Sequence, residues 1–273
     1  MDRQVLKVAR KFSGKLLAQG AEGVVLFGSR VRGDAYKESD IDIHAIGRGS
    51  RHKLERFQGF LISVSWATGR SYREAFRSPG KVGGVISPWR GAKIIYDPKG
   101  IAESLKREAQ EWRWELLGAR ADKWVAEELT GWAEEVHKLV GNLELGQRES
   151  AAVQRSLLAI HLARILATHH RILYDSENQL WSVVSAKMGS KWAKVQSAAL
   201  GEDDENFVDT CSAALQLFAL AANDVRCVLD DRQFRVIAHA CEIAGYPLKN
   251  DLNDDFRSAK PLRIDEKGRG TSQ

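Results

Sequence analysis

Two aspartates separated by a single residue are the part of this sequence best suited to chemistry. Asp40 and Asp42 alternate with Ile41 and Ile43. On a β-strand, residues two apart point to the same face, so the two carboxylates would lie side by side while the isoleucines face the core. Neighbouring carboxylates repel each other, and a cation relieves that repulsion. Because Mg²⁺ binds oxygen ligands, often one or two carboxylates plus water and substrate phosphates, the pattern predicts an Mg²⁺ site at Asp40 and Asp42.

A glycine-serine pair precedes the aspartates, directly after the apolar run 24–27. Gly28 lets the backbone approach a ligand closely. Ser29 can cap a short following helix, whose free N–H groups favour an anion. The turn at Gly28 and Ser29 is therefore predicted to form the second half of the site and to bind an anionic group.

Gly28, Ser29, ten further residues, Asp40 and Asp42 fit the pattern G-S-x10-D-x-D. This segment resembles the signature of the polymerase-β-like nucleotidyltransferases. The resemblance implies that Asp40 and Asp42 bind Mg²⁺ and act in catalysis on a nucleoside triphosphate, with ATP expected. It also implies that Gly28, Ser29, Arg30 and Arg32 bind the nucleotide's phosphates. The alternative is a surface loop followed by an aspartate-capped strand without a metal.

The remaining segments predict an α+β fold: a nucleotidyltransferase-type mixed sheet with flanking helices, followed by an all-α helical bundle. Apolar spacing predicts a helix over 3–18 and strands over 24–27, 41–46, 60–66 and 93–96, with a polar stretch at 47–56, a short helix at 71–77 and a loop at 80–84. From residue 101 onward the spacing is helical. We expect a catalytic domain at 1–100, a helical bundle at 101–253 and a loose charged tail at 254–273.

This order of parts is similar to that of the aminoglycoside nucleotidyltransferases of the kanamycin type. Ile94–Gly100 resembles the turn that closes their sheet, and His169–Tyr174 resembles a segment of their helical domain. The resemblance implies transfer of a nucleoside monophosphate to a hydroxyl of a small aminoglycoside-like acceptor. The acceptor would lie between the domains, and a second copy of the chain would complete the site in a homodimer.

The sequence departs from that family at the third metal-binding acid. The strand at 60–66 should supply it, and the matching residue is Ser63. Glu55 and Glu74 are the nearest alternative acids. With one carboxylate fewer, the second ion of a two-metal site loses a ligand, so a catalytically weakened nucleotide-binding or regulatory protein is an alternative function.

The general base of that family is a glutamate on the first long helix of the helical domain. Approximate register places it near Glu134, Glu135 or Lys138, and we expect Glu134 or Glu135 to act in catalysis. The pair His169 and His170 is expected to have one buried and one exposed member.

The chain has 41 Lys and Arg against 36 Asp and Glu, and residues 51–120 carry fourteen basic side chains against seven acidic ones. This local excess fits a polyphosphate ligand or a solvated surface. An alternative function is therefore a nucleotidyltransferase that modifies a protein or extends an RNA end, although nucleic acid is not the expected partner. The observation behind this alternative is a basic cluster, namely Arg70, Arg73, Arg77, Lys81 and Arg90.

Three cysteines show neither a disulfide framework nor zinc spacing, so we expect Cys211, Cys227 and Cys241 to be buried thiols in a reducing compartment.

No apolar run is long enough to cross a bilayer, and no secretory segment begins the sequence. The predicted location is the cytoplasm. The phosphate-loop, dinucleotide and nucleophile-elbow motifs are absent from the sequence.

Overall fold

The computed structural model describes residues 2–50, 52–202 and 206–248, and it divides the chain into two compact units. Unit 1 comprises Met1–Leu117 with Leu173–Gln179, and unit 2 comprises Gly118–Ile172 with Leu180–Gln273. A mixed sheet with helices precedes a set of packed helices, so the predicted α+β class is confirmed. The domain boundary near residue 100 stays a prediction, and the expected tail at 254–273 lies outside the described residues.

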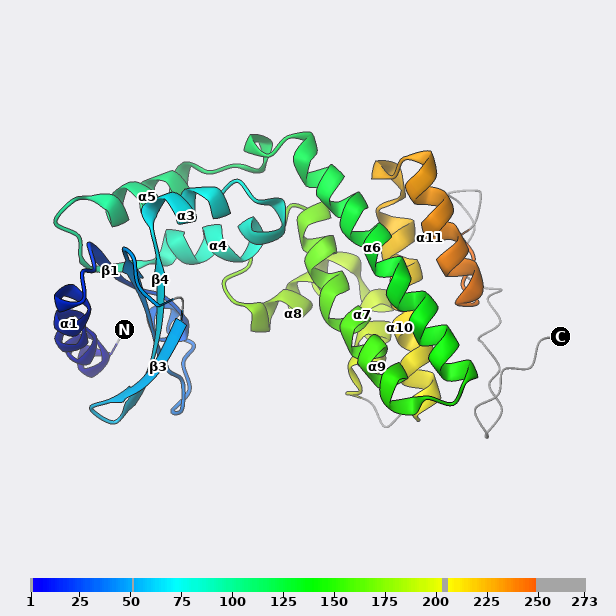
Figure 1. Cartoon of the computed structure of the whole chain (residues 1–273), viewed down its shortest axis with the longest axis horizontal. Helices are drawn as coiled ribbons and strands as arrows, with labels where there is room; N and C mark the ends of the chain where they lie inside the picture. Colours follow the sequence, from blue (N-terminus) through cyan, green and yellow to red (C-terminus); the bar gives the residue numbers. More distant parts are fainter. Residues whose placement is uncertain (1, 51, 203–205, 249–273) are drawn as a thin grey trace. The chain divides into compact units, whose positions relative to one another are not determined.

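Unit 1 is built on a five-stranded sheet in the order β3-β4-β2-β1-β5 (Figure 1). Its strands are β1 (Gly23–Leu26), β2 (Ile41–Ile46), β3 (His52–Phe57), β4 (Phe60–Ala67) and β5 (Lys93–Tyr96). Its helices are α1 (Arg3–Ala18), α2 (Ser29–Arg32), α3 (Gly69–Ala75), α4 (Pro79–Gly91), α5 (Ile101–Glu111) and the 3-10 helix η1 (Trp114–Leu116). Strands β2 and β4 are parallel, whereas the other neighbours in the sheet are antiparallel.

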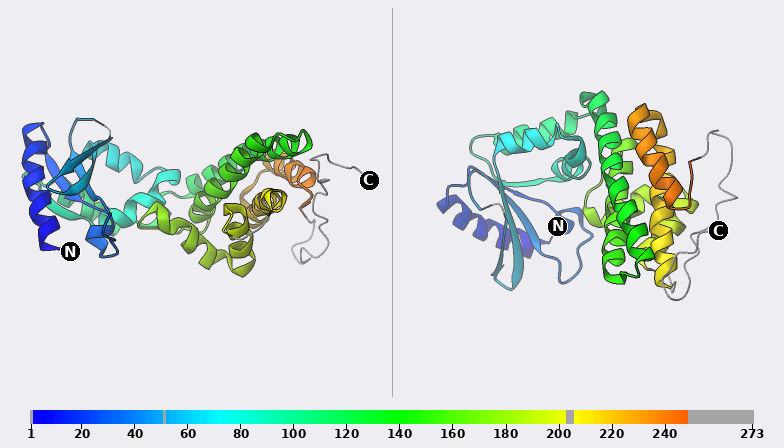
Figure 2. Two further views of the ribbon diagram at one scale, coloured as in Figure 1. Left: turned by 90° about the horizontal axis from the view of Figure 1, so that it is seen from below. Right: turned by 45° about the vertical axis from the view of Figure 1, so that its right-hand side comes forward.

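The two faces of the sheet have different surroundings. One face packs against the apolar side of α1 and forms a continuous core that includes Phe12, Ile41 and Ile43. The opposite face is turned toward α3 and α4, and Figure 2 shows α1 and these helices on opposite sides of the strands. Because side chains alternate along β2, the residues between the isoleucines point to this second face. Asp42 is therefore held on the face opposite the α1 core.

The stretch 47–56, described from the sequence only as polar and without a predicted strand, contains most of strand β3 (His52–Phe57). The strand was missed because β3 lies at the edge of the sheet, pairs with β4 alone and carries mostly exposed side chains. An edge strand with polar residues on both faces lacks the apolar alternation by which strands are recognised in a sequence. The tight connection through Gln58 and Gly59, both at positive φ, leads directly into β4.

The glycine-rich segment 80–84, expected to be a loop, lies inside α4. Pro79 occupies the first turn of this helix, where a missing N–H costs nothing. Gly84 has a packing role, because a Cβ there would lie 2.7 Å from Cε2 of Tyr174. Tyr174 is buried and donates its backbone N–H to the carbonyl of Gly83 at 2.9 Å. Gly84 therefore gives Tyr174 room to lie against α4.

Unit 2 consists of packed helices. They are α6 (Ala119–Glu144), α7 (Arg148–His169), most of α8 (Glu177–Met188), α9 (Ser190–Leu200), α10 (Phe207–Asp224), the 3-10 helix η2 (Arg226–Val228) and α11 (Asp231–Ile243). Helix α7 packs against α6, α9 and α10, and α11 packs against α6. Small alanine side chains fill much of the buried side of α10, which allows close helix packing.

The cysteines are partly as expected. Cys211 and Cys241 are buried free thiols, and burial raises the pKa of each, to about 11 and about 12. Cys227 is exposed, so its expected burial was wrong: it lies on the short helix η2, not on the apolar side of a long helix.

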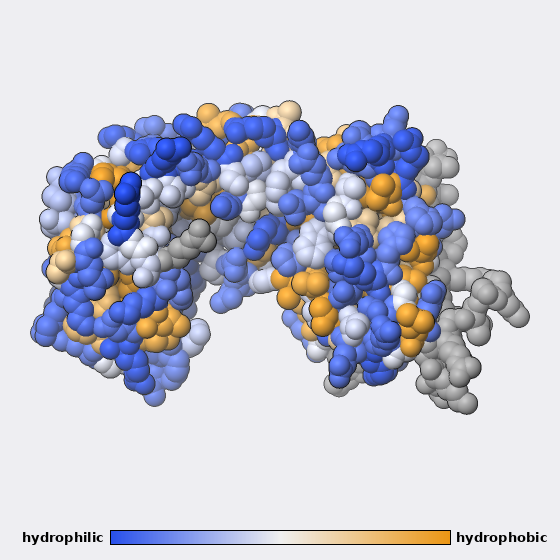
Figure 3. Space-filling view, in the orientation of Figure 1, coloured by the Kyte–Doolittle hydropathy of each residue, from blue (hydrophilic) through white to orange (hydrophobic). Residues whose placement is uncertain are grey.

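No helix within the described ranges is both long and apolar enough to cross a bilayer. In the view of Figure 3, hydrophilic residues predominate over both units and apolar residues occur in small groups.

Candidate active site

Strand β2 positions the two aspartates. Asp40 directly precedes the strand, and Asp42 is its second residue. The carbonyl of Asp42 accepts a hydrogen bond from the N–H of Phe27 at 3.0 Å, which fixes the end of β1 beside β2. Gly28 follows with φ 76° and ψ −170°, a conformation that is essentially restricted to glycine. A Cβ at this position would overlap the carboxylate of Asp42 and lie 2.9 Å from its Cγ. The observed position of the Asp42 carboxylate is therefore compatible only with glycine at position 28.

The carboxylate of Asp42 is held in an unfavourable charge environment. Burial raises its pKa, and the neighbouring Asp40 raises it further. Arg32, His52 and a hydrogen bond from Ser63 act in the opposite direction. The net effect is a raised pKa, as expected for two carboxylates that share one side of a strand without full compensation by cationic side chains. A divalent cation would supply that compensation.

The register of the sheet places Ser63 opposite Asp42 across the parallel pair β2 and β4. The predicted position of the absent third acid is therefore next to Asp42, and a hydroxyl occupies it. Ser63 Oγ also lies 3.2 Å from Nε2 of His52, which comes from the edge strand β3. The two alternative acids have basic partners: Glu55 pairs with Lys15 at 2.6 Å and Glu74 pairs with Arg70 at 2.8 Å.

The two arginines of the motif differ in their contacts. Arg30 donates from Nε to the carbonyls of Ser39 and Asp40 at 3.0 and 3.1 Å, so it holds the loop that leads into β2. Arg32 donates from Nε to Asp34 at 3.2 Å and lowers the pKa of Asp42. Arg32 also lines the pocket described below. The structure thus brings Arg32 to the aspartates and uses Arg30 to position them.

Helix α2 begins at Ser29 and is four residues long. The residue that caps it is Gly28, without a side-chain hydrogen bond, so the expected cap by Ser29 was wrong. The first N–H groups of any helix have no partner within it. Ser29 also lines the pocket, together with Asp40 and Asp42.

A pocket of about 880 Å³ adjoins the aspartates, and all the residues that line it belong to unit 1. Five of them carry carboxylates and one carries a guanidinium, namely Asp34, Asp40, Asp42, Asp175, Glu177 and Arg32. Asp175 and Glu177 come from the segment 173–179, which returns to unit 1 after helix α7. The pocket is therefore strongly acidic, although residues 51–120, which contribute part of its lining, carry more basic than acidic side chains.

The segment 173–179 is held in place by several hydrogen bonds. Ser87 Oγ donates to Asp175 Oδ1 at 2.5 Å, and Arg32 Nη1 donates to the carbonyl of Asp175 at 3.3 Å. Gln179 Nε2 donates to Asp34 Oδ2 at 3.5 Å. These contacts connect α4, α2 and the loop before β2 to one short segment, so Asp175 has a fixed position on the pocket wall.

His44 continues the alternation of Asp40 and Asp42 along β2 and also lines the pocket. Burial lowers its pKa to about 4, so the imidazole is neutral at neutral pH. Its Nδ1 lies 2.8 Å from the hydroxyl of Tyr72, whose own pKa burial raises. The ring also packs 4.3 Å from that of Phe27. His44 therefore connects the aspartate strand to α3 through a neutral hydrogen bond.

Glu134 and Glu135, the predicted catalytic glutamates, lie on α6 in unit 2. Both pair with Lys138, at 2.9 and 2.8 Å respectively. They are not among the residues that line the unit 1 pocket, and their catalytic role stays a prediction. The histidine pair differs from expectation: His169 and His170 are both partly buried, with side chains 14% and 20% exposed.

The basic cluster of the sequence consists largely of side chains with partners in unit 1. Arg73 pairs with Glu108 at 2.7 Å, and Arg70 pairs with Glu74. Arg90 donates to the carbonyls of Ala109 and Trp112, each at 2.9 Å. Because these cations have acidic or carbonyl partners, their number in the sequence overstates the charge available to a nucleic acid.

Sequence reasoning missed Asp175, Glu177 and His44. A signal for His44 was present, because it occupies the next position of the same alternation along the strand. Asp175 and Glu177 are distant from the motif in the sequence, and only the fold brings their segment to the pocket.

Residues 6–129 match the model of the nucleotidyltransferase domain family. No curated protein matches the chain. Among solved structures, the chain is similar to the crystal structure of a nucleotidyltransferase-like protein from Exiguobacterium sibiricum 255-15, with 11% identity, a TM-score of 0.47, and coverage of 88% of this chain and 78% of that one. The matched residues include the glycine-serine turn, both aspartates and the whole sheet, and so this chain contains a nucleotidyltransferase domain.

Proposed function

We propose that this protein transfers a nucleoside monophosphate from a nucleoside triphosphate, ATP by preference, to a hydroxyl of a small cationic acceptor of the aminoglycoside type. The observation that carries the proposal is the acidic pocket of unit 1. It has five carboxylates and one guanidinium, next to the turn that the nucleotidyltransferase motif predicts for phosphates. Two of those carboxylates suffice for a metal, and the remaining three suit a ligand with amino groups.

The donor set at Asp40 and Asp42 fits Mg²⁺. Both groups are carboxylates, they share one side of β2, and the adjoining pocket has room for phosphates and water. A bound Mg²⁺ neutralises charge on the transferred phosphoryl group and its leaving group. The requirement for glycine at position 28 supports this assignment, because it lets the Asp42 carboxylate lie directly against the turn.

Within this proposal, Ser29 and Arg32 bind the phosphates of the nucleotide. Arg32 is the only guanidinium among the described residues that line the pocket, and a guanidinium matches phosphate geometry. Arg30 contributes by holding the carbonyls of Ser39 and Asp40 and so orients the aspartates. Gly28 contributes a backbone conformation without a side chain, which lets the turn lie directly against Asp42. Nucleotidyl transfer requires mainly such positioning and charge neutralisation.

The acceptor hydroxyl must lose a proton as it attacks phosphorus. Asp175 is a carboxylate of the same pocket, held by Ser87 and separate from the proposed metal ligands. We assign to it the role of general base, while Asp34 and Glu177 attract the amino groups of the acceptor. A base must lie within hydrogen-bond reach of the proton it removes, and the pocket wall offers that position to a bound acceptor.

The experiment is pyrophosphate release from each ribonucleoside triphosphate with Mg²⁺, measured against a panel of aminoglycosides and of neutral sugars of similar size. Release that requires one triphosphate and a cationic acceptor, and that Asp42→Asn abolishes, supports the proposal. The matched control is Glu38→Gln, an exposed acid of the same loop that does not line the pocket. Equal release with neutral sugars would contradict the acceptor class.

A second candidate function is a weakened nucleotide-binding protein, and Ser63 in place of the third acid favours it. Such a protein binds ATP and Mg²⁺ in a calorimeter but releases no pyrophosphate with any acceptor. Ser63→Glu would then raise turnover, whereas in an active one-metal enzyme it would change turnover little. A homodimer is part of the main proposal, and the molar mass in solution by light scattering tests it.

A further inference from the structure

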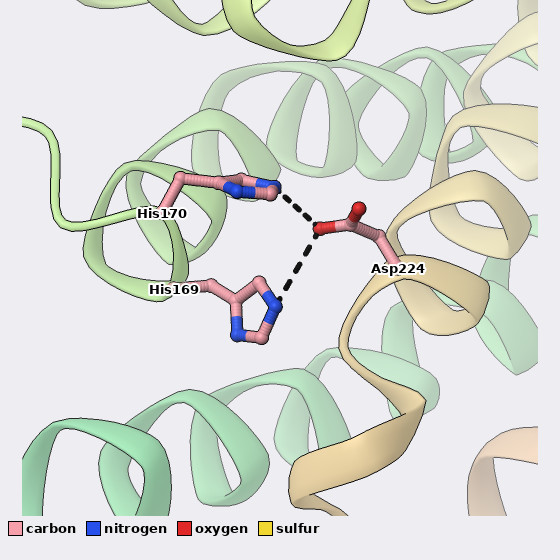
Figure 4. Close-up of side chains that lie close together, drawn as sticks. All are labelled: His169, His170 and Asp224. Carbon is pink, nitrogen blue, oxygen red and sulfur yellow. Dashed lines mark hydrogen bonds and ion pairs between the residues drawn. The ribbon is translucent and has the colours of Figure 1, made fainter.

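Two histidines and an aspartate meet in unit 2, in a part of the molecule that the proposed transfer reaction does not use. His169 is the last residue of α7 and His170 caps that helix, while Asp224 is the last residue of α10. Figure 4 shows both imidazoles turned toward one carboxylate oxygen. One ligand atom from each residue lies within 4.8 Å of the others. Among residues 2–50, 52–202 and 206–248, this is the one group of three or more such side chains with that arrangement.

The distances are close to those of a tetrahedral metal site. His170 Nε2 lies 2.7 Å and His169 Nε2 lies 3.8 Å from Asp224 Oδ2. With metal–nitrogen and metal–oxygen bonds of about 2.1 Å, tetrahedral ligand atoms are separated by roughly 3.4 Å. The two observed separations lie on either side of this value. Changes of about 0.7 Å and about 0.4 Å would bring these two separations to that value.

His169 has no other satisfactory partner. Its Nδ1 is buried without a hydrogen bond in the described part of the chain, and its Nε2 lies too far from Asp224 for one. The atom that an ion at this site would bind is Nε2, which faces the Asp224 carboxylate, whereas Nδ1 is the other ring nitrogen. The hydrogen bond between His170 and Asp224 accounts for the positions of those two side chains, but it does not account for the position of His169. The arrangement leaves His169 facing the carboxylate at a distance at which an ion could join them.

The charge around the cluster permits a cation. The nearby Arg171 pairs with Asp122 at 2.6 Å, so its guanidinium charge is compensated. Neutral imidazoles and one carboxylate form a nitrogen and oxygen donor set, which suits zinc, cobalt and nickel better than magnesium. All three side chains are partly exposed, between 14% and 26%. A water molecule can therefore reach the fourth position.

We propose that His169, His170 and Asp224 form a binding site for a divalent ion of the zinc class, which joins the C-terminal ends of α7 and α10. The site has three protein ligands and one position for water. The ion would connect two helices of unit 2 that already pack together, and it would stabilise the folded chain because it binds only the folded arrangement. This inference does not depend on the proposed nucleotidyl transfer.

The test uses the purified full chain, freed of metal and kept in millimolar Mg²⁺ so that the aspartates of unit 1 are competed for. Zn²⁺ is titrated by calorimetry and Co²⁺ by its visible absorption, which reports nitrogen and oxygen ligands in tetrahedral geometry. We expect one ion per chain, a higher unfolding temperature with Zn²⁺, and an affinity about 100-fold or more weaker in His170→Ala, since even residues outside the ligand set change affinity 10- to 100-fold.

The variant Asp224→Asn removes the charged ligand while keeping its shape, and it should weaken Zn²⁺ binding as His170→Ala does. Circular dichroism shows whether each variant folds. The matched control is His239→Ala, which removes a mostly exposed histidine near Glu242 elsewhere in unit 2 and should change nothing. Zn²⁺ affinity that is the same in wild type, His170→Ala and Asp224→Asn would overturn the proposal. So would the absence of a tetrahedral Co²⁺ spectrum in the wild-type chain.

Discussion

The two units each gather acidic or ligating side chains, but they do so in different ways. In unit 1, Asp40 and Asp42 are carboxylates on one side of β2 at the wall of a large pocket. In unit 2, Asp224 is surrounded by two imidazoles at the ends of two helices. The first set offers oxygen atoms alone and an open space for a substrate. The second offers two nitrogen atoms and one carboxylate.

The difference shows how donor chemistry separates catalysis from stabilisation. Burial and the neighbouring charge of Asp40 raise the pKa of Asp42, and a metal–nucleotide complex would relieve the repulsion between the two carboxylates on binding. The cluster of unit 2 has a single carboxylate, already hydrogen-bonded to His170. An oxygen-only pair beside a pocket suits an exchangeable Mg²⁺, whereas imidazoles suit a tightly held ion of the zinc class.

The largest expected effect is that a substitution in either site impairs that site and leaves the other unchanged. Asp42→Asn should lower turnover about a thousandfold or more, because it removes several kcal/mol of metal-dependent stabilisation, while Zn²⁺ affinity stays unchanged. Asp224→Asn should weaken Zn²⁺ binding and leave turnover with saturating ATP and Mg²⁺ unchanged. Pyrophosphate release and Zn²⁺ calorimetry on both variants measure this. If Asp224→Asn lowered turnover as strongly as Asp42→Asn, the two sites would not be independent.

The second prediction concerns the backbone on which the unit 1 site depends. Gly28→Ala should lower turnover about 100-fold and destabilise the fold by about 1–3 kcal/mol, because it forces a side chain into a conformation reserved for glycine and against the Asp42 carboxylate. Gly33→Ala is the matched control: Gly33 also has positive φ, but a Cβ there meets nothing within 4 Å. Similar losses of turnover in both variants would indicate that backbone strain alone, and not the contact with Asp42, is responsible.

The third prediction concerns pH. The folded-state pKa of His44 is about 4, against 6.5 in a solvated imidazole. The unfolded chain therefore binds a proton more readily than the folded one at mildly acidic pH. The stability contributed by neutral His44 is fully present above pH 6.5 and is lost as the pH falls toward 4, by roughly 3 kcal/mol in total. Urea unfolding of wild type and His44→Gln measures this loss as the part of the pH dependence that the variant lacks.

Other groups that titrate over the same range are common to both proteins, so they cancel in that comparison. His239→Gln, which changes a mostly exposed imidazole in unit 2, is the control and should retain the wild-type pH dependence. Equal pH dependence in wild type and His44→Gln would contradict a buried neutral His44.

Much of unit 1 could be predicted from the sequence because its signals are local. The isoleucines that alternate with Asp40 and Asp42 face the α1 core, as their period of two requires. The edge strand β3 escaped prediction, because a strand exposed on both faces needs no apolar residues. The glycine-rich segment of α4 indicated a loop, and the packing role of Gly84 could not be foreseen because Tyr174, which contacts it, lies far away in the sequence. Long-range packing of this kind leaves no periodic pattern.

The site was predictable to a similar extent. The turn at Gly28 and the paired aspartates are adjacent in the chain, so their spacing was informative. Arg30 shows a limit of such reasoning: its type suggested a phosphate ligand, yet its hydrogen bonds to backbone carbonyls give it a positioning role. Asp175 shows another limit, because it reaches the pocket on a segment that returns to unit 1 from the helical half of the sequence.

The smallest effect we predict decides which unit supplies the general base. Asp175→Asn should lower the turnover number about 30-fold, a little less than the roughly 100-fold at the lower end of the range typical of general acid–base catalysis, while the Michaelis constant for ATP stays unchanged. Glu135→Gln, whose carboxylate pairs with Lys138 in unit 2, should leave turnover within about twofold if Asp175 acts alone.

The opposite outcome, with Glu135→Gln impaired and Asp175→Asn active, would also identify the roles of these two carboxylates. If Glu135→Gln lowered the turnover number and Asp175→Asn did not, Asp175 would not be the base and would serve only to attract the cationic acceptor. In that case Asp175→Asn should raise the Michaelis constant for the acceptor and leave the turnover number unchanged. A side chain that only attracts the acceptor acts on binding, whereas a base acts on the chemical step, so measuring both constants for the two variants separates the roles.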